Sequence, residues 1–242
     1  MGDGWMRKKL LATLTAVALA GSLFTSATMA KSTNAKESLV ALGDSIPFGY
    51  NLGVNNQHPS KDAFPFLIEN DGKDFRVNNL GVPGWRSDQL LNALENDQKF
   101  RQAVRHADTI TLSIGSNDLL QGLSKGDLNV AAIQVAAAKM LANLKTTITE
   151  IRSLTDAPIV VYNIYNPFQL DDPLHGLGAT LLPGINTQIS AVVGSFMDST
   201  ISVANAFTAF GTNQEIYVIQ GDIHPTLAGQ EVLANLAEEA LD

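Results

Sequence analysis

Residues 38–45 read SLVALGDS, an apolar run that stops at a small, polar corner. A short apolar run of this kind predicts a buried strand, and open α/β folds bind their ligands at the carboxyl ends of their strands. The sequence therefore predicts that Ser45 lies at the ligand-binding edge of a sheet, which makes Ser45 the candidate nucleophile. Because Gly-Asp-Ser is also common in turns, this assignment depends on the rest of the chain.

Four more segments read as short buried strands, and longer helical or irregular stretches separate them. Together with residues 39–43 they are residues 75–80, 109–114, 159–163 and 216–219. Apolar residues at helical spacing predict a helix over residues 130–154, and Pro225 opens a final helix, since proline suits a first helical turn. Strands that alternate with helices predict a mostly parallel sheet covered on both faces. We expect an α/β protein, a flavodoxin-like three-layer α/β/α sandwich with a five-stranded, mostly parallel sheet.

Residues 166–184 differ from the rest because glycines and prolines interrupt an otherwise apolar segment. Long segments with so many helix breakers are typical of surface loops, and long loops in compact domains are often functional. Two interpretations remain open at this point. The segment is a lid that offers an apolar surface to a substrate, or it is a loop that packs on the core.

The N-terminus has the pattern of a secretory signal peptide. A basic start at residues 6–9 precedes an apolar run over residues 10–24. Thr28 and Ala30 then offer small residues at the −3 and −1 positions of a cleavage site. The run is shorter than the roughly 20 apolar residues of a spanning helix, so a membrane anchor is the weaker interpretation. Cleavage after Ala30, with Ala35 as the second choice, leaves one domain over residues 31–242. This predicts a secreted, extracellular bacterial protein with no stable membrane insertion after cleavage.

Charge and cysteine content exclude several classes of function. The chain has a formal net charge of −8, and loss of Arg7, Lys8, Lys9 and Asp3 with residues 1–30 takes it to −10. An acidic chain without clustered Lys and Arg disfavours nucleic acid as a partner. The chain has no cysteine, which excludes disulfides, a thiol nucleophile and a zinc–thiolate site.

Three further motifs follow predicted strands or precede the last helix. They are NLGVPG at residues 79–84, GSND at residues 115–118 and GDIHP at residues 221–225. A serine that transfers an acyl group needs a base, an acid that orients the base, and hydrogen-bond donors for the oxyanion. The motifs offer a backbone N–H, the side chain of Asn117, and the pair Asp222 and His224. Asp44 and Asp118 are expected to cap or brace their loops, because aspartate readily bonds nearby backbone amides.

In these four blocks the chain resembles the SGNH (GDSL) hydrolase superfamily, which is named for its serine, glycine, asparagine and histidine. Ser45, Gly81, Asn117 and His224 match the blocks in order. The resemblance implies a secreted serine esterase or lipase that uses no metal and no cofactor, with Ser45, Gly81 and Asn117 forming the oxyanion hole. Family members usually carry the acid three residues before the histidine. Gly221 stands there in this chain, so the acid is assigned to Asp222, two residues before.

Three functions remain open on the sequence. The leading one is a carboxylic-ester hydrolase that acts on small-molecule or lipid esters with short- to medium-chain acyl groups. The second uses the same site to remove O-acetyl groups from a carbohydrate or cell-wall polymer. The third is a non-catalytic exported binding module that retains the fold.

Overall fold

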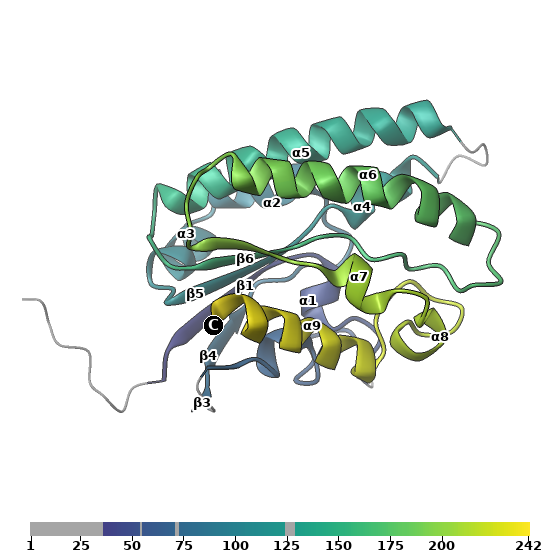
Figure 1. Ribbon diagram of the computed structural model, residues 1–242. Helices are drawn as coiled ribbons and strands as arrows, with labels where there is room; N and C mark the ends of the chain where they lie inside the picture. The colour runs from purple at the N-terminus through teal and green to yellow at the C-terminus, as the bar shows by residue number, and fades with distance from the viewer. Residues whose placement is uncertain (1–35, 54, 71–72, 124–128) are drawn as a thin grey trace, which may run out of the picture. The chain divides into compact units, whose positions relative to one another are not determined.

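The computed structural model describes residues 36–53, 55–70, 73–123 and 129–242 (Figure 1). The predicted signal peptide, residues 1–30, lies outside these residues. The main sheet has five strands, and every pairing in it is parallel. In chain order the strands are β1 (Ser38–Gly43), β4 (Arg76–Asn79), β5 (Thr109–Ser113), β6 (Ile159–Tyr162) and β7 (Ile201–Ala204). Their order across the sheet, β4-β1-β5-β6-β7, is the flavodoxin-like order that the sequence predicts.

Strand β1 lies inside the sheet and shows why the fold has three layers. All six of its residues are buried. Val40 and Leu42 belong to an apolar cluster that includes α2 (Ser87–Asn96), α5 (Val130–Arg152) and α6 (His175–Gly194). Leu39 and Ala41 belong to a second cluster with α9 (Leu227–Leu241). Successive side chains of a strand point to opposite faces, so the run is apolar throughout because both faces are covered (Figure 1).

The two helices that the sequence predicts are present. Helix α5 is capped by the side chain of Asn129, which accepts from the N–H of Ala132, and its buried residues recur at helical spacing. Helix α9 is capped by Thr226, so Pro225 precedes the helix rather than lying in its first turn. Gln230 of α9 is fully buried, accepts from the N–H of Phe64 at 2.8 Å and donates to the carbonyl of Ile46 at 3.2 Å. These bonds join the last helix to the segment that carries Ser45.

The prediction of a strand over residues 216–219 is wrong. Helix α8 (Gln214–Tyr217) takes the first half of this segment, and Val218 makes a single antiparallel bridge with Pro225. A four-residue apolar run suits a strand and a buried helical turn equally well, so its sequence could not decide between them. The fifth strand is β7, which sequence analysis missed because it is short and contains a serine. Arg152 holds the chain just before β7 through Asp198 and the hydroxyl of Thr200, each at 2.8 Å.

The interpretation of residues 166–184 as a loop or lid holds only for their first part, because α6 begins at His175. The helix includes Pro183, which is exposed. Its buried residues Leu182, Ile185, Ile189 and Val193 recur three or four positions apart, which is helical spacing. Pro183 lies on the solvent side, so it removes one backbone donor but leaves the packing of the buried face unchanged. This packing keeps the segment helical.

The remaining elements are short and connect or flank the main layers. They are α1 (Ser45–Phe48), η1 (Phe64–Phe66), the antiparallel pair β2 (Glu69–Asn70) and β3 (Lys73–Asp74), α3 (Gln98–Arg105), α4 (Ser116–Gln121) and α7 (Ala206–Phe210). Within the part of the chain that the structure describes, no helix combines the length and apolar character needed to cross a bilayer.

Candidate active site

Ser45 is the first residue of α1, directly after β1, and it is buried. Asp44 caps the helix, since its Oδ1 atom accepts from the N–H of Ile46 at 3.0 Å. The N–H of Ser45 lies in the first helical turn, where backbone amides have no acceptor within the helix. The end of the strand therefore presents a hydroxyl and a backbone donor at the carboxyl edge of the sheet.

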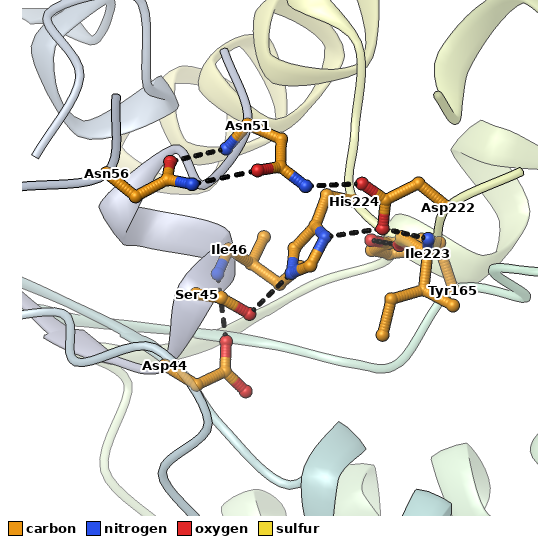
Figure 2. A network of polar contacts seen from close by, with 9 residues as sticks. All are labelled: Asp44, Ser45, Ile46, Asn51, Asn56, Tyr165, Asp222, Ile223 and His224. Atoms are coloured by element: carbon orange, nitrogen blue, oxygen red, sulfur yellow. Dashed lines mark hydrogen bonds and ion pairs between the residues drawn. The ribbon is translucent and has the colours of Figure 1, made fainter. Parts of the chain in front are cut away.

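The structure brings His224 and Asp222 to Ser45, as Figure 2 shows. The His224 Nε2 atom lies 2.9 Å from Ser45 Oγ, and its Nδ1 atom lies 2.7 Å from Asp222 Oδ1. The ring of Tyr50 packs against the imidazole with 5.0 Å between the ring centroids. Serine, imidazole and carboxylate thus form a continuous relay, even though the carboxylate stands two rather than three residues before the histidine.

A tight turn over residues 219–224 lets Asp222 contact His224 from two positions earlier in the chain. The N–H of Ile219 donates to the carbonyl of His224 at 2.9 Å, and the N–H of Asp222 donates to the carbonyl of Ile219 at 3.0 Å. Gly221 has a φ of 72°, in the left-handed region that glycine adopts readily. The Tyr165 hydroxyl anchors the turn by donating to the carbonyl of Ile223 at 2.7 Å. The turn brings the Asp222 carboxylate next to the His224 ring, so an aspartate two residues before the histidine still reaches the imidazole.

Asp222 is held in its ionised form. Burial acts to raise the pKa of its carboxyl, but hydrogen bonds from the Asn51 side chain, the Ile223 N–H and His224 outweigh burial and leave the pKa below its ordinary value. An ionised acid beside Nδ1 fixes the imidazole with Nε2 free to accept the serine proton.

Asn117 lies at the start of α4, where β5 ends. Its Nδ2 atom donates to the carbonyl of Trp85 at 2.9 Å and lies 3.5 Å from Asp44 Oδ2. Asn117 and Ser45 line the same cavity. The bond to Trp85 uses one of the two N–H groups of this amide, so the amide still has a neutral donor to offer at the cavity that Ser45 lines.

Asp44 and Asp118 have the bracing roles expected of them. Asp44 caps α1, and Asp118 accepts from both the N–H and the hydroxyl of Ser87, at 2.9 and 2.6 Å, where α2 begins. Burial raises the pKa of Asp44 to about 7 and also raises the pKa of Asp118. Neither carboxyl contacts the imidazole.

The structure places Gly81 differently from the oxyanion role expected of it. Its N–H donates to Asn79 Oδ1 at 2.9 Å. A Cβ at this position would lie 2.8 Å from the carbonyl oxygen of Asp44 and 2.9 Å from the nitrogen of Phe48. The absence of a side chain at Gly81 thus lets the loop after β4 pack closely against α1, and its N–H is already engaged.

Gly84, in the same loop, offers a backbone donor that sequence analysis did not consider. The N–H of Trp85 donates to the carbonyl of Val82 at 3.1 Å, and Gly84 has a φ of 80°, which together define a type II turn. The N–H of Gly84 has no acceptor among the residues that the structure describes. Trp85, its neighbour, accepts from Asn117. The Pro83-Gly84 pair is a sequence signal for such a turn, so Gly84 could have been proposed beside Gly81.

An apolar cavity of about 60 Å³ opens beside Ser45 and Asn117. Its wall comes mainly from α4, the β6–α6 connection and α6, and includes Leu120, Phe168, Leu177, Leu181, Leu182 and Ile185. The part of residues 166–184 that contributes side chains here is largely helical. Among the described residues, no group of three His, Asp or Glu side chains is placed to hold a metal ion.

A serine after β1 that is hydrogen-bonded to a histidine before α9, on a flavodoxin-like sheet, is the arrangement of an SGNH-type α/β hydrolase. The family model described as GDSL-like lipase/acylhydrolase matches residues 41–232, and the chain belongs to this family. The uncharacterized protein YpmR of Bacillus subtilis is 33% identical over 144 residues, which cover 57% of this chain and 56% of that protein.

Two solved structures illustrate the shared fold. A lipase, Lip_vut3, from a goat rumen metagenome superposes with a TM-score of 0.71 at 22% identity, over 85% of this chain and 97% of that chain. An acetylxylan esterase from Geobacillus stearothermophilus superposes with a TM-score of 0.61 at 16% identity, over 85% of this chain and 94% of that chain. Membership of the GDSL-like lipase/acylhydrolase family makes this protein an ester hydrolase.

Proposed function

We propose that the protein is a serine-dependent carboxylic-ester hydrolase that acts on esters with short- to medium-chain acyl groups. The observation that carries the substrate class is the apolar cavity beside Ser45 Oγ. An ester whose carbonyl carbon lies at Oγ can extend its acyl chain along Leu177, Leu181 and Leu182. Burial of each methylene there contributes about 0.8 kcal/mol, so the cavity favours an acyl chain longer than acetyl.

The proposed mechanism uses the relay in the order of its hydrogen bonds. His224 Nε2 takes the proton of Ser45 Oγ as the oxygen attacks the ester carbonyl carbon, and Asp222 stabilises the imidazolium that forms. The imidazolium then donates its proton to the departing alcohol oxygen, leaving an acyl-serine. A water molecule, deprotonated by His224 in the same way, hydrolyses the acyl-serine and regenerates Ser45.

The oxyanion of each tetrahedral intermediate needs donors on the side away from the leaving group. We assign the N–H of Ser45 and the side chain of Asn117 to this role, together with the N–H of Gly84 in place of that of Gly81. The assignment to Gly84 is supported by its unengaged N–H and by the bond that joins its neighbour Trp85 to Asn117. Gly81 is replaced because Asn79 already accepts from its N–H.

A series of p-nitrophenyl esters from acetate to laurate tests the function. We expect hydrolysis that rises from acetate to butyrate or octanoate, and that disappears in Ser45→Ala. A fluorophosphonate probe should label the wild-type protein and leave Ser45→Ala unlabelled. Equal hydrolysis by the two proteins on every ester would overturn the serine mechanism.

The same series separates the two alternatives from the proposal. An O-acetyl esterase would act on acetate and lose activity with each longer chain, and the shared fold with an acetylxylan esterase makes this the alternative to test first. A non-catalytic binding module would hydrolyse no ester and would not be labelled. Export is a further part of the proposal, and sequencing the N-terminus of protein recovered from a culture medium tests whether the chain starts after Ala30 or Ala35.

A further inference from the structure

Two asparagines outside the Ser45–His224–Asp222 relay hold its acidic end (Figure 2). The Nδ2 atom of Asn51 donates to Asp222 Oδ2 at 2.6 Å. Asn56 in turn binds Asn51 twice: its Nδ2 donates to Asn51 Oδ1, and its Oδ1 accepts from the backbone N–H of Asn51, both at 2.8 Å. The outer carboxylate oxygen of Asp222 is therefore bound to a residue 171 positions away in the chain.

The direction of these bonds follows from one backbone group. The N–H of Asn51 can only donate, so the atom of Asn56 that faces it must be Oδ1. The other end of that amide is then Nδ2, which must face an acceptor, Asn51 Oδ1. The remaining end of the Asn51 amide is Nδ2, a donor, and it faces the carboxylate. Flipping either amide would set two like groups against each other, so the pair presents a donor to Asp222.

The backbone of Asn51 is shaped for this contact. Its φ of 66° lies in the left-handed region, which only one other non-glycine residue, Met197, enters in the described part of the chain. Asparagine tolerates this conformation better than most residues, and unusual backbone conformations gather at functional sites. The preceding residue, Tyr50, donates its N–H to the carbonyl of Ser45 at 3.1 Å and packs its ring on His224. The loop that carries Asn51 is thus joined to both nucleophile and base.

The bond from Asn51 restrains the Asp222 carboxylate, which stands one position away from the usual place of the acid. Asp222 Oδ1 is shared between the imidazole of His224 and the N–H of Ile223, the latter at 2.6 Å. Oδ2 has Asn51 as its bonding partner among the described residues, and the side chain of Asp222 is 21% exposed. Without Asn51 the carboxylate would be free to turn about its last torsion and to exchange the amide for water.

We infer that Asn51, oriented by Asn56, is a positioning residue that holds Asp222 against His224 in this chain. The inference rests on the proposed esterase activity. Asn51 does not touch the substrate and acts only through the carboxylate. Hydrogen bonds to charged groups are stronger than neutral ones, but this one is partly exposed, so we expect loss of the contact to lower kcat roughly tenfold with little change in KM.

Asn51→Gly is the most specific test, because glycine adopts a φ of 66° readily and the substitution removes only the amide side chain. Gln57→Gly is its matched control: Gln57 is exposed in the same loop, and the change also replaces an amide side chain with glycine. Both are compared with wild type on one p-nitrophenyl ester, with thermal unfolding as a check on folding. We expect the tenfold loss of kcat in Asn51→Gly and wild-type kcat in Gln57→Gly.

A double-mutant cycle with Asp222→Ala distinguishes positioning from a general structural effect. If Asn51 acts through the carboxylate, Asn51→Gly causes no further loss of kcat in the Asp222→Ala protein. An equal tenfold loss in both backgrounds would overturn the inference, and so would wild-type kcat in Asn51→Gly alone. An inactive wild-type protein would instead overturn the proposed function, so the two failures are distinguishable.

Asn51→Asp adds a readout that a structural role would not move. A carboxyl at position 51 would face Asp222 Oδ2, and two carboxyls this close share one proton. The kcat/KM profile should therefore gain an ionisation that the wild-type profile lacks. The other ionisable groups around the relay, Tyr50, Tyr165 and Asp44, are unchanged in this variant. A profile with the same ionisations as wild type would show that residue 51 has no electrostatic contact with Asp222 and would overturn the inference.

Discussion

The Nε2 atom of His224 lies 2.9 Å from the Oγ atom of Ser45, although 179 residues separate them in the chain. The contact joins the end of β1 to the turn before α9, the two segments that Gln230 also links through the carbonyl of Ile46. Ser45 and His224 are thus held together by helix packing as well as by their own hydrogen bond.

Removing the base should cost more activity than removing the acid. We expect His224→Ala to lower kcat by roughly four orders of magnitude or more, because Ser45 then has no proton acceptor. Asp222→Ala should lower kcat less, since the imidazole remains in place without its partner. Steady-state rates on one ester give the comparison, and a larger loss in Asp222→Ala would contradict the proposed order of roles.

Asn117→Ala tests the oxyanion hole. Loss of one such donor costs about 2.7–4 kcal/mol of transition-state stabilisation, so kcat should fall by roughly two to three orders of magnitude. The fold should survive, because the side chain gives up only its bonds to the Trp85 carbonyl and to Asp44 Oδ2, and circular dichroism can verify this. Full turnover in a folded Asn117→Ala protein would place Asn117 outside the site.

Gly81 and Gly84 should respond differently to alanine. At Gly81 the new Cβ would meet backbone atoms of Asp44 and Phe48 at 2.8 and 2.9 Å, and backbone cannot move aside cheaply. We expect Gly81→Ala to lower the free energy of unfolding by about 1–3 kcal/mol. A Cβ added at Gly84 would have no atom within 4 Å apart from its chain neighbours, so Gly84→Ala adds only the strain of a φ of 80°. Denaturant unfolding compares the two, and a Gly81→Ala protein as stable as wild type would refute the close packing.

The apolar cavity should set the preferred acyl length. Leu181→Trp on α6 fills space beside Ser45, so activity on octanoate should fall while activity on acetate is kept. Ala179→Trp, on the exposed part of the same helix, is the control and should leave the length profile unchanged. The ratio of kcat/KM on the two esters is the measurement, and an unchanged ratio in Leu181→Trp would remove the cavity from the acyl-binding role.

Burial of Asp44 predicts a pH-dependent stability. Its pKa is about 7 in the folded protein against 3.8 as the ordinary value, so between these values the folded state holds a proton that the unfolded state has released. Stability from this group is fully present below pH 3.8 and is lost as the pH rises through about 7.

Asp44→Asn keeps an oxygen to cap α1 and removes the titration. The variant should therefore gain stability relative to wild type as the pH rises from about 4 to about 7. Melting temperatures measured across this range test the prediction, and parallel curves for the two proteins would contradict it.

Local patterns were enough to predict the architecture and the chemistry-bearing motifs. Four of the five strands, the helix α5 and the positions of Ser45, Asn117, Asp222 and His224 at the carboxyl edge follow from apolar runs that end in polar corners. These features are readable because burial on both faces makes a strand uniformly apolar, and because turn residues mark where each strand ends.

Tertiary contacts decided the rest. The segment over residues 214–217 is a helix and residues 201–204 form the last strand, because short apolar runs take the conformation that their neighbours select. Two glycines lie in one loop, and only the structure shows that the Asn79 side chain accepts from the N–H of Gly81 while the N–H of Gly84 has no acceptor among the described residues. The bond from Asn51 to Asp222 joins residues 171 positions apart, and no local pattern encodes a contact that exists only when distant loops meet.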